Sequence, residues 1–191
     1  MEWDVLDGVW AERTLFDEEL EFIRVWENNP VEIDTVCGII NECGDRMFMD
    51  DGLLHWATPL THEFIRKECM EKRVYLAVSK STGEAVATFN LDTRANAYFD
   101  IDAKAIYIQR LAVRPKYWNK GIDTKCYEFA VRMANEYGAN CIRSSVYEAS
   151  ARAVSFLKRR GYRELYRRHS RNFVVLCMES DKGINRKEEK A

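Results

Sequence analysis

The pattern of apolar and polar positions at the start of the chain predicts a strand followed by a helix. Residues 9–15 can form the strand, and Asp17 then stands at a suitable N-cap position, with Glu18 and Glu19 in the first turn. Carboxylates there accept hydrogen bonds from the free N–H groups of the turn and interact favourably with the helix dipole. We therefore expect the first helix to begin directly after Asp17.

A second helix is predicted where Asn29 precedes Pro30, because asparagine is a good N-cap and proline suits the first helical position. Apolar residues then recur every three to four positions as far as Gly44, so that one side of the helix faces a core. Residues 45–60 are expected to form a loop, and a third helix, capped by its threonine, is expected over residues 61–72.

After the third helix the hydrophobic pattern changes to that of strands. Residues 74–79 and 85–91 are rich in residues that favour strands, and the polar turn between them is typical of a hairpin. Residues 92–104 are polar and are expected to form a loop before a further strand at 105–113.

The clearest helix lies over residues 121–137, where apolar side chains fall on one stripe and Gly138 follows as a stop signal. The remaining elements are, in order, a strand at 141–147, a helix at 150–160 and strands at 162–168 and 173–178. Helices and strands thus mix along residues 1–180, which we expect to form a single α/β domain followed by a charged, frayed tail at 181–191.

Composition narrows the class of protein. A chain of 191 residues with a hydrophobic fraction of 47% can bury a full core without disulfides or metals. Its six cysteines form no C-x-x-C pair and stand among apolar neighbours, so we interpret them as reduced core residues rather than metal ligands. There is neither a secretory signal nor an apolar run of about 20 residues, which predicts a cytoplasmic protein with no membrane contact.

Charge is distributed unevenly although the net charge is only −2. Residues 1–60 contain 15 acids and 3 bases, whereas residues 138–191 contain 6 acids and 13 bases. This asymmetry favours one region that faces a cation and another that faces an anion. The alternative is that solvated faces of opposite charge happen to lie in different parts of the chain.

Chemistry is indicated most clearly where the strand at 105–113 is followed by a short loop and a helix. Asn119, Lys120 and Gly121 stand around the start of this helix. Unpaired backbone N–H groups and the positive helix end favour an anion there, above all a phosphate, and a glycine lets it approach the backbone closely. A plain turn between a strand and a helix is the alternative.

Two segments of the sequence resemble the GNAT superfamily of N-acetyltransferases. The first reads Leu-Ala-Val-Arg-Pro at 111–115 and Lys-Gly-Ile at 120–122, and the second, at 150–162, is similar to the N-x-x-A…Y…G-F segment of that family. The likeness extends over about residues 8–178. It implies a mixed, mostly antiparallel sheet with helices on both faces.

The resemblance also implies acetyl-CoA as the acyl donor and no metal. In the family, the backbone after this strand binds the pantetheine arm and the acyl carbonyl, and the following loop binds the pyrophosphate. Carried over to this sequence, the residues that bind acetyl-CoA are Leu111, Ala112, Val113, Trp118, Asn119, Lys120, Gly121, Ile122, Asp123, Thr124 and Ser150.

Several positions depart from the family pattern. Trp118 replaces the usual arginine or glutamine of the phosphate loop, and Asp123 replaces its last small residue. Gln109 stands where many members carry a glutamate as general base, and Leu157 where a tyrosine often acts as general acid. Proximity and a polarised carbonyl still allow direct transfer to an amine. The alternative is a catalytically silent module that binds acyl-CoA or a protein partner.

Tyr147 and Glu148 are the nearest candidates for the missing catalytic acid and base. They stand at the end of the strand that follows the helix at 121–137. A core tyrosine beside a surface glutamate is the alternative interpretation of the pair.

No motif identifies the acceptor. In GNAT folds the first helices usually wall the acceptor site, and here they carry the acidic excess, which predicts a cationic amine on a small molecule or peptide. In the competing interpretation these acids only solvate the outer helix faces. A nucleic-acid partner is not expected, because the basic run from Lys158 to Arg171 spans a helix end and a strand. A homodimer remains open.

Overall fold

A computed structural model describes residues 20–54, 56–95, 97–100, 103–170 and 172–185. Its elements are, in chain order, β1 (Leu20–Val25), α2 (Pro30–Asp51), α3 (His62–Glu71), β2 (Arg73–Ser79), β3 (Ala85–Asp92), β4 (Ala105–Val113), the 3₁₀ turn η1 (Pro115–Tyr117), α4 (Ile122–Tyr137), β5 (Cys141–Tyr147), α5 (Ala151–Arg159), β6 (Arg163–Ser170) and β7 (Phe173–Ser180). The strands form one sheet in the order β1-β2-β3-β4-β5-β7-β6. Only β4 and β5 pair in parallel, so the predicted mostly antiparallel sheet is confirmed.

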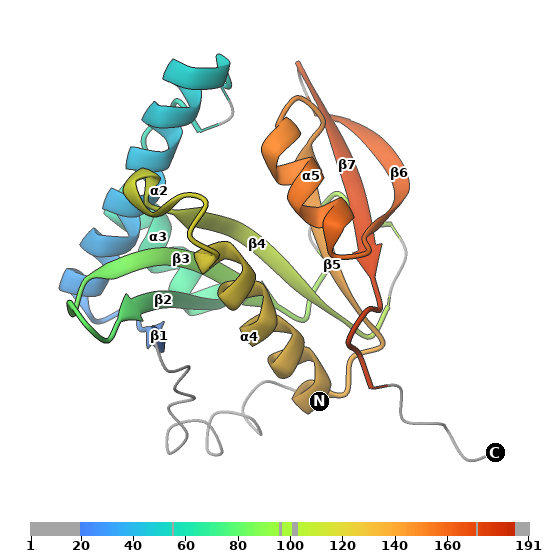
Figure 1. Cartoon of the computed structure of the whole chain (residues 1–191), viewed down its shortest axis with the longest axis horizontal. Coiled ribbons are helices and arrows are strands. Elements are labelled where there is room, and N and C mark those ends of the chain that lie inside the picture. Colours follow the sequence, from blue (N-terminus) through green and yellow to red (C-terminus); the bar gives the residue numbers. More distant parts are fainter. Residues whose placement is uncertain (1–19, 55, 96, 101–102, 171, 186–191) are drawn as a thin grey trace.

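Helices cover both faces of this sheet, as expected (Figure 1). On one face α2 and α3 bury Ile40 and Ile65. On the other face α4 stacks Phe129 on Phe22 of β1, with 4.5 Å between the ring centroids, and α5 adds Phe156. Full burial of a side chain of this size contributes about 1.5–3 kcal/mol, so two apolar cores hold the helices to the sheet.

The helix expected after Asp17 is wrong for the residues that the structure describes, because Leu20–Val25 is strand β1. This strand pairs antiparallel with β2 along its whole length. Leu20 and Phe22 lie in the core beneath α4, and this packing outweighs the helix-start signal of the acidic residues before them. The predicted strand at 9–15 and Asp17 itself lie outside the described residues.

The second helix is longer than predicted. α2 continues to Asp51 and ends at Gly52, whose φ of +65° lets its N–H bond back to the last turn. Gly44 is therefore not a stop but a packing residue, since a Cβ there would lie 2.3 Å from the carbonyl oxygen of Trp56. No described helix, including this one, is long and apolar enough to cross a membrane.

The cysteines agree with expectation. All six are free and buried, which confirms that they are reduced core residues.

The segment after β7 is not frayed at its start. Asn135 of α4 donates a hydrogen bond to the carbonyl of Gly183 (2.8 Å) and accepts one from the N–H of Asn185 (2.7 Å). Residues 186–191 lie outside the described residues.

Candidate active site

β4 and β5 lie side by side only at their first residues. Their parallel ladder joins residues 105–107 to residues 141–143. Ser144 Oγ then donates a hydrogen bond to the carbonyl of Ile108 over 3.1 Å, and beyond this point the two strands diverge (Figure 1). Backbone groups on the β5 side of β4 therefore have no strand beside them, and such groups need a ligand or water as partner.

A β-bulge distorts β4 at the same place. Between the pairs Thr88–Ala112 and Asn90–Gln109, two residues of β4 oppose one residue of β3. The first of the two, Arg110, has a φ of +51°, a conformation that costs a non-glycine residue about 1–2 kcal/mol. Because of the extra residue, Gln109 and Arg110 both reach the end of α3 instead of pointing to opposite faces.

The diverging strands enclose a cleft of about 1170 Å³, which is larger than most sites for one small ligand. Its walls come from β4, β5, the end of α2 and the loop after it, the start of α4, and α5. Eight of the predicted site residues line it: Leu111, Ala112, Val113, Trp118, Asn119, Asp123, Tyr147 and Ser150. The structure thus brings together residues that were predicted from separate segments.

The loop from β4 to α4 forms one end of the cleft. Asn119 and Gly121 have positive φ values of 61° and 78°, and Gly121 is the N-cap of α4 without a side-chain cap. A Cβ on Gly121 would meet nothing within 4 Å, so the backbone is open to approach from that side. Free N–H groups at the start of a helix suit a phosphate. The other predicted residues of the loop, Lys120, Gly121, Ile122 and Thr124, adjoin the cleft without lining it.

Asp123 places a negative charge in the first turn of α4. Its Oδ1 accepts a hydrogen bond from the N–H of Thr124 over 2.9 Å. Arg160 donates to the hydroxyl of Thr124, and its positive charge acts on Asp123. Arg159 of α5 also lines the cleft, so the surrounding guanidinium groups offset the carboxylate at this end.

Arg152 joins two helices across the cleft and also contacts Trp118. The indole Nε1 of Trp118 donates to the carbonyl of Val113 over 2.6 Å, and the guanidinium of Arg152 lies 4.9 Å from its ring centroid. Arg152 also pairs with Asp50 and Asp51, with N–O distances of 3.7 and 3.6 Å. The end of α2 and the start of α5 are therefore connected through one arginine.

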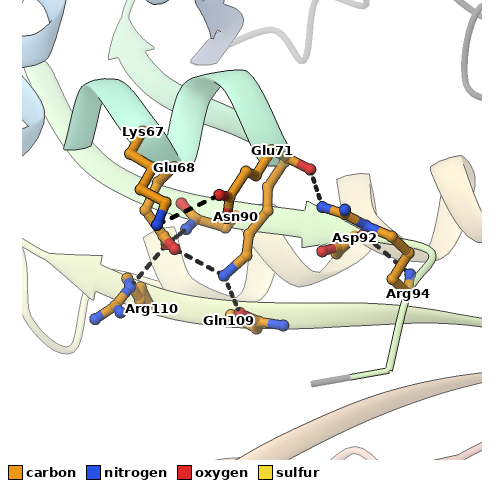
Figure 2. A network of polar contacts seen from close by, with 9 residues as sticks. Lys67, Glu68, Glu71, Asn90, Asp92, Arg94, Gln109 and Arg110 are labelled. Carbon is orange, nitrogen blue, oxygen red and sulfur yellow. Dashed lines mark hydrogen bonds and ion pairs between the residues drawn. The ribbon is translucent and has the colours of Figure 1, made fainter. Parts of the chain in front are cut away.

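At the opposite end of the cleft, polar residues of α3, β3 and β4 form a buried network. Glu68 accepts hydrogen bonds from Lys72 (2.8 Å), Asn90 (2.6 Å) and Arg110 (3.0 Å), and Figure 2 shows Glu68 and Arg110 pointing toward one another. Lys72 Nζ also donates to Gln109 Oε1 over 3.0 Å. Burial alone raises the pKa of Glu68, but the hydrogen bond from Lys72 and the charge of Arg110 hold that pKa below its usual value.

The two candidate catalytic residues lie in different places. Tyr147 lines the cleft beside Tyr98, and burial together with this neighbour raises its pKa, so its hydroxyl stays protonated at neutral pH. Glu148 is not a lining residue, and its carboxylate lies 2.6 Å from Arg167 of β6. Leu157 is a core residue that also borders the cleft. The structure brings Tyr147, but not Glu148, to the other predicted site residues.

Comparison with a family model identifies the family to which the chain belongs. Residues 45–162 match the model of the acetyltransferase (GNAT) family, which is more than half of the chain. The chain belongs to the GNAT acetyltransferase family. Acetyl-CoA is the acyl donor in this family, and the donor-binding residues implied by the resemblance gather along β4, α4 and the start of α5.

Solved structures show the same GNAT fold at low sequence identity. The ribosomal-protein-S18-alanine N-acetyltransferase of Escherichia coli has a TM-score of 0.66 and 12% identity, over 90% of this chain and 99% of that one. A GNAT-family acetyltransferase of Listeria monocytogenes has a TM-score of 0.62 and 16% identity, over 84% and 95%. A chain of the NatC complex bound to Gag peptide and CoA has a TM-score of 0.60 and 15% identity, over 84% and 97%. No curated protein sequence matches the chain significantly.

The sequence did not point to the network at the far end of the cleft. Lys72 and Glu68 belong to no GNAT motif, and Arg110 stands one residue before the motif begins. The spacing of apolar residues in β4 carries the one available signal. Ile108 and Leu111 both pack toward the core under α4, three positions apart instead of two, which indicates a bulge between them.

Proposed function

We propose that this protein is an N-acetyltransferase that moves an acetyl group from acetyl-CoA directly to an amine. The observation that supports this most strongly is the cleft between β4 and β5, which ends on the open start of α4. The unpaired edge of β4 offers N–H and C=O groups to the amide-bearing arm of the donor. Arg152, Arg159 and the first N–H groups of α4 suit its pyrophosphate.

In the proposed reaction the neutral acceptor nitrogen attacks the thioester carbonyl carbon. A C–N bond forms, the C–S bond breaks, and the proton released by the nitrogen reaches the leaving sulfur through water or a side chain. Holding the two reactants in one cleft supplies much of the rate increase, and N–H groups aimed at the carbonyl oxygen stabilise the charge that develops there. The thioester of the donor supplies the activated acyl group.

Among the described cleft residues, Tyr147 is the candidate proton donor to the leaving sulfur, because its raised pKa keeps it protonated. The carboxylates near the cleft are already engaged. Glu68 accepts from three donors, Asp51 pairs with Arg152, and Asp123 bonds the N–H of Thr124. We therefore propose that the acceptor gives up its proton to water, which restricts reaction to the fraction of amine that is already neutral.

A silent module that binds acyl-CoA is the second candidate. It is favoured by Gln109 and Leu157, which cannot serve as base and acid, and by the absence of an unengaged carboxylate among the described residues of the cleft. Binding and catalysis are therefore measured separately.

The experiment combines thermal unfolding with thiol release. Acetyl-CoA at about 100 times its dissociation constant is expected to stabilise the protein by about 2.7 kcal/mol. Release of free thiol in the presence of an amine panel then supports the transferase. Stabilisation without thiol release favours the silent module, and the lack of any stabilisation by acyl-CoA contradicts both.

Two further proposals concern the charge of the acceptor and the location of the protein in the cell. Glu32 and Asp34, which contributed to the predicted acidic wall, are not lining residues of the cleft. Asp34 instead contacts His62 on a separate surface, at 2.8 Å. The acidic excess therefore gives little support to a cationic acceptor. Six reduced cysteines support a cytoplasmic location.

A further inference from the structure

The far end of the cleft, beyond the β-bulge, is lined by hydrogen-bond donors that are only partly engaged. We call Lys72, Gln109 and Arg110 the donor cluster. Lys72 Nζ carries three protons and contacts two acceptors, Glu68 and Gln109. Gln109 Nε2 is buried and has no hydrogen-bond partner in the structure. All three residues line the cleft, so a ligand in it can contact this cluster.

The orientation of Gln109 follows from its neighbour. Because an ammonium group can only donate, Lys72 must contact the carbonyl oxygen of this amide, and the NH₂ group is left on the other side. The guanidinium group of Arg110 is likewise hydrogen-bonded at only one of its edges. Its Nε donates to Glu68 and its guanidinium lies 4.8 Å from the ring centroid of Phe64, while its two terminal nitrogens form no hydrogen bond to another described side chain. A buried amide donor without a partner is destabilising, so the site is built for an acceptor atom from outside.

Charge in the donor cluster is positive. Lys72 and Arg110 share Glu68 as counter-ion, which leaves one positive charge in excess. Glu68 itself does not line the cleft, and the two carboxylates that do, Asp51 and Asp123, belong to the end of α2 and the start of α4, at the end proposed for acetyl-CoA. Among the described lining residues, the acceptor end therefore presents cations and donors without an unpaired anion.

Another part of the cleft wall is apolar. Met47 near the end of α2 and Leu53, Trp56 and Leu60 of the following loop line the cleft. A ligand that contacts both this wall and the donor cluster needs an anionic group of small size next to an apolar substituent. A carboxylate matches the fork of a guanidinium and accepts several hydrogen bonds at once.

We infer that the acceptor is an amine that carries a carboxylate within a few bonds and an apolar side chain, in the manner of an apolar amino acid. The terminal nitrogens of Arg110, the free NH₂ of Gln109 and the third proton of Lys72 bind the carboxylate. The apolar wall takes the side chain, and the amine points along β4 toward the acyl group. This inference rests on the proposed function for the direction of transfer, but the binding site itself can be tested without turnover.

The test compares two ligands that differ only in the carboxylate. N-acetyl-L-phenylalanine and N-acetyl-L-phenylalaninamide are titrated calorimetrically into the protein, with and without CoA. The acid is expected to bind at least about tenfold more tightly than the amide. Equal affinities, tighter binding of the amide, or no binding of either ligand at about 10 mM would overturn the inference.

Variants assign the effect to the donor cluster. Arg110→Gln is expected to reduce the ratio of acid to amide affinity several-fold, and Arg110→Lys, which keeps the charge, is expected to retain part of it. The matched control is Lys67→Gln, which removes one positive charge from the exposed side of the same helix α3. An unchanged ratio in Arg110→Gln contradicts the inference. Because the readout is a ratio within one protein sample, a partly unfolded variant lowers both affinities without changing it.

Turnover is measured separately, with L-phenylalanine and L-phenylalaninamide as acceptors of acetyl-CoA. Each rate is divided by the neutral fraction of its amine, because the amine of the amide has the lower pKa. Turnover of the amide in preference to the acid after this correction leaves the proposed transferase intact and overturns the acceptor class. Selective binding of the acid without turnover of either supports the acceptor site and contradicts the transferase. The two proposals therefore fail in different experiments.

Discussion

Two residues of the β4–α4 loop take backbone conformations that decide its shape. Asn119 tolerates the left-handed region better than most side chains, and Gly121 has no penalty there. The glycine was expected because a phosphate needs to approach the backbone closely. The structure adds a second reason, since its φ of +78° disfavours any other residue even though the space around it is empty.

Gly121→Ala is expected to lose about 1–2 kcal/mol of unfolding free energy from backbone strain, and also to weaken CoA binding, because the new methyl group stands where phosphate approaches. Gly83→Ala is the matched control. Gly83 has a φ of +70° and equally open surroundings, but it lies in the turn between β2 and β3. Urea unfolding and CoA titration of both variants check this. Equal CoA affinities in the two folded variants would show that the loop is only a turn.

Tyr147 is the second residue whose role can be isolated. If its hydroxyl donates the proton to the leaving sulfur, Tyr147→Phe is expected to lower kcat by about 10²-fold or more, with little change in the affinity for CoA. Glu148→Gln is measured beside it under the same conditions. A larger loss of kcat at Glu148 than at Tyr147 would reverse the assignment, since it would place the chemistry at the residue paired with Arg167.

At the scale of elements, the contact of α3 with β3 and β4 depends on one buried carboxylate. Glu68 has the three partners described above, and they hold its pKa below the usual value of 4.5 against the effect of burial. A carboxyl group whose pKa is lowered on folding stabilises the protein above its unfolded pKa. That stabilisation is lost as the pH falls through the folded pKa, when the group takes up a proton.

Glu68→Gln is therefore expected to lose about 2 kcal/mol of unfolding free energy at pH 7, where charge-assisted hydrogen bonds are replaced by neutral ones. The difference from the parent protein should shrink below pH 4.5, since the parent then loses the same charge. Unfolding in urea between about pH 3 and 7 measures both curves. A difference that stays constant over this range would mean that folding does not lower the pKa of Glu68.

Most elements were predictable because their signals are local. The apolar stripe of α4, the hairpin of β2 and β3, and the caps of α2 and α3 lie within short segments, and the structure contains them all. The first described strand was missed because pairing with β2 is a tertiary effect. Gly44 was misread because helix stops and close packing both favour glycine, and only the approach of Trp56 distinguishes them.

The site was predictable only in part, for a related reason. Spacing within one segment predicted the loop that we propose binds acetyl-CoA, since its backbone and helix start are continuous in sequence. The donor cluster joins Lys72 after α3 to Gln109 and Arg110 in β4, 37 residues apart for the contact of Lys72 with Gln109. Neither the residue types nor their spacing in the sequence indicates such a contact before the fold is known.

On the scale of the whole molecule, the charged residues that are unevenly distributed along the sequence lie on different surfaces. The basic C-terminal part contributes Arg152 and Arg159 to the cleft. Its other described cations are spread over β5, α5, β6 and the segment after β7, and several are paired, as Arg163 is with Glu179 at 2.8 Å and Arg167 with Glu148 at 2.6 Å. This arrangement suits an anionic donor in the cleft rather than an extended basic surface.

The short ladder between β4 and β5 also divides the molecule into two pieces of consecutive chain. One piece holds β1 to β4 with α2, α3 and α4, and the other holds β5, α5, β6 and β7. Three residue pairs join their strands, while an apolar core beneath α4 includes Ile142 and Met178 of the second piece. A chain cut between α4 and β5, at residues 139–140, therefore separates two fragments along an existing boundary.

Such fragments are expected to reassociate weakly on their own and more tightly with acetyl-CoA, because the donor would contact β4 in one and α5 in the other. Analytical ultracentrifugation of the mixed fragments, with and without acetyl-CoA, measures this, and association that is indifferent to the ligand would argue against it. The gap that makes room for a substrate would then also make the association of the two fragments depend on the ligand, so that a split form of the protein would report whether acetyl-CoA is bound.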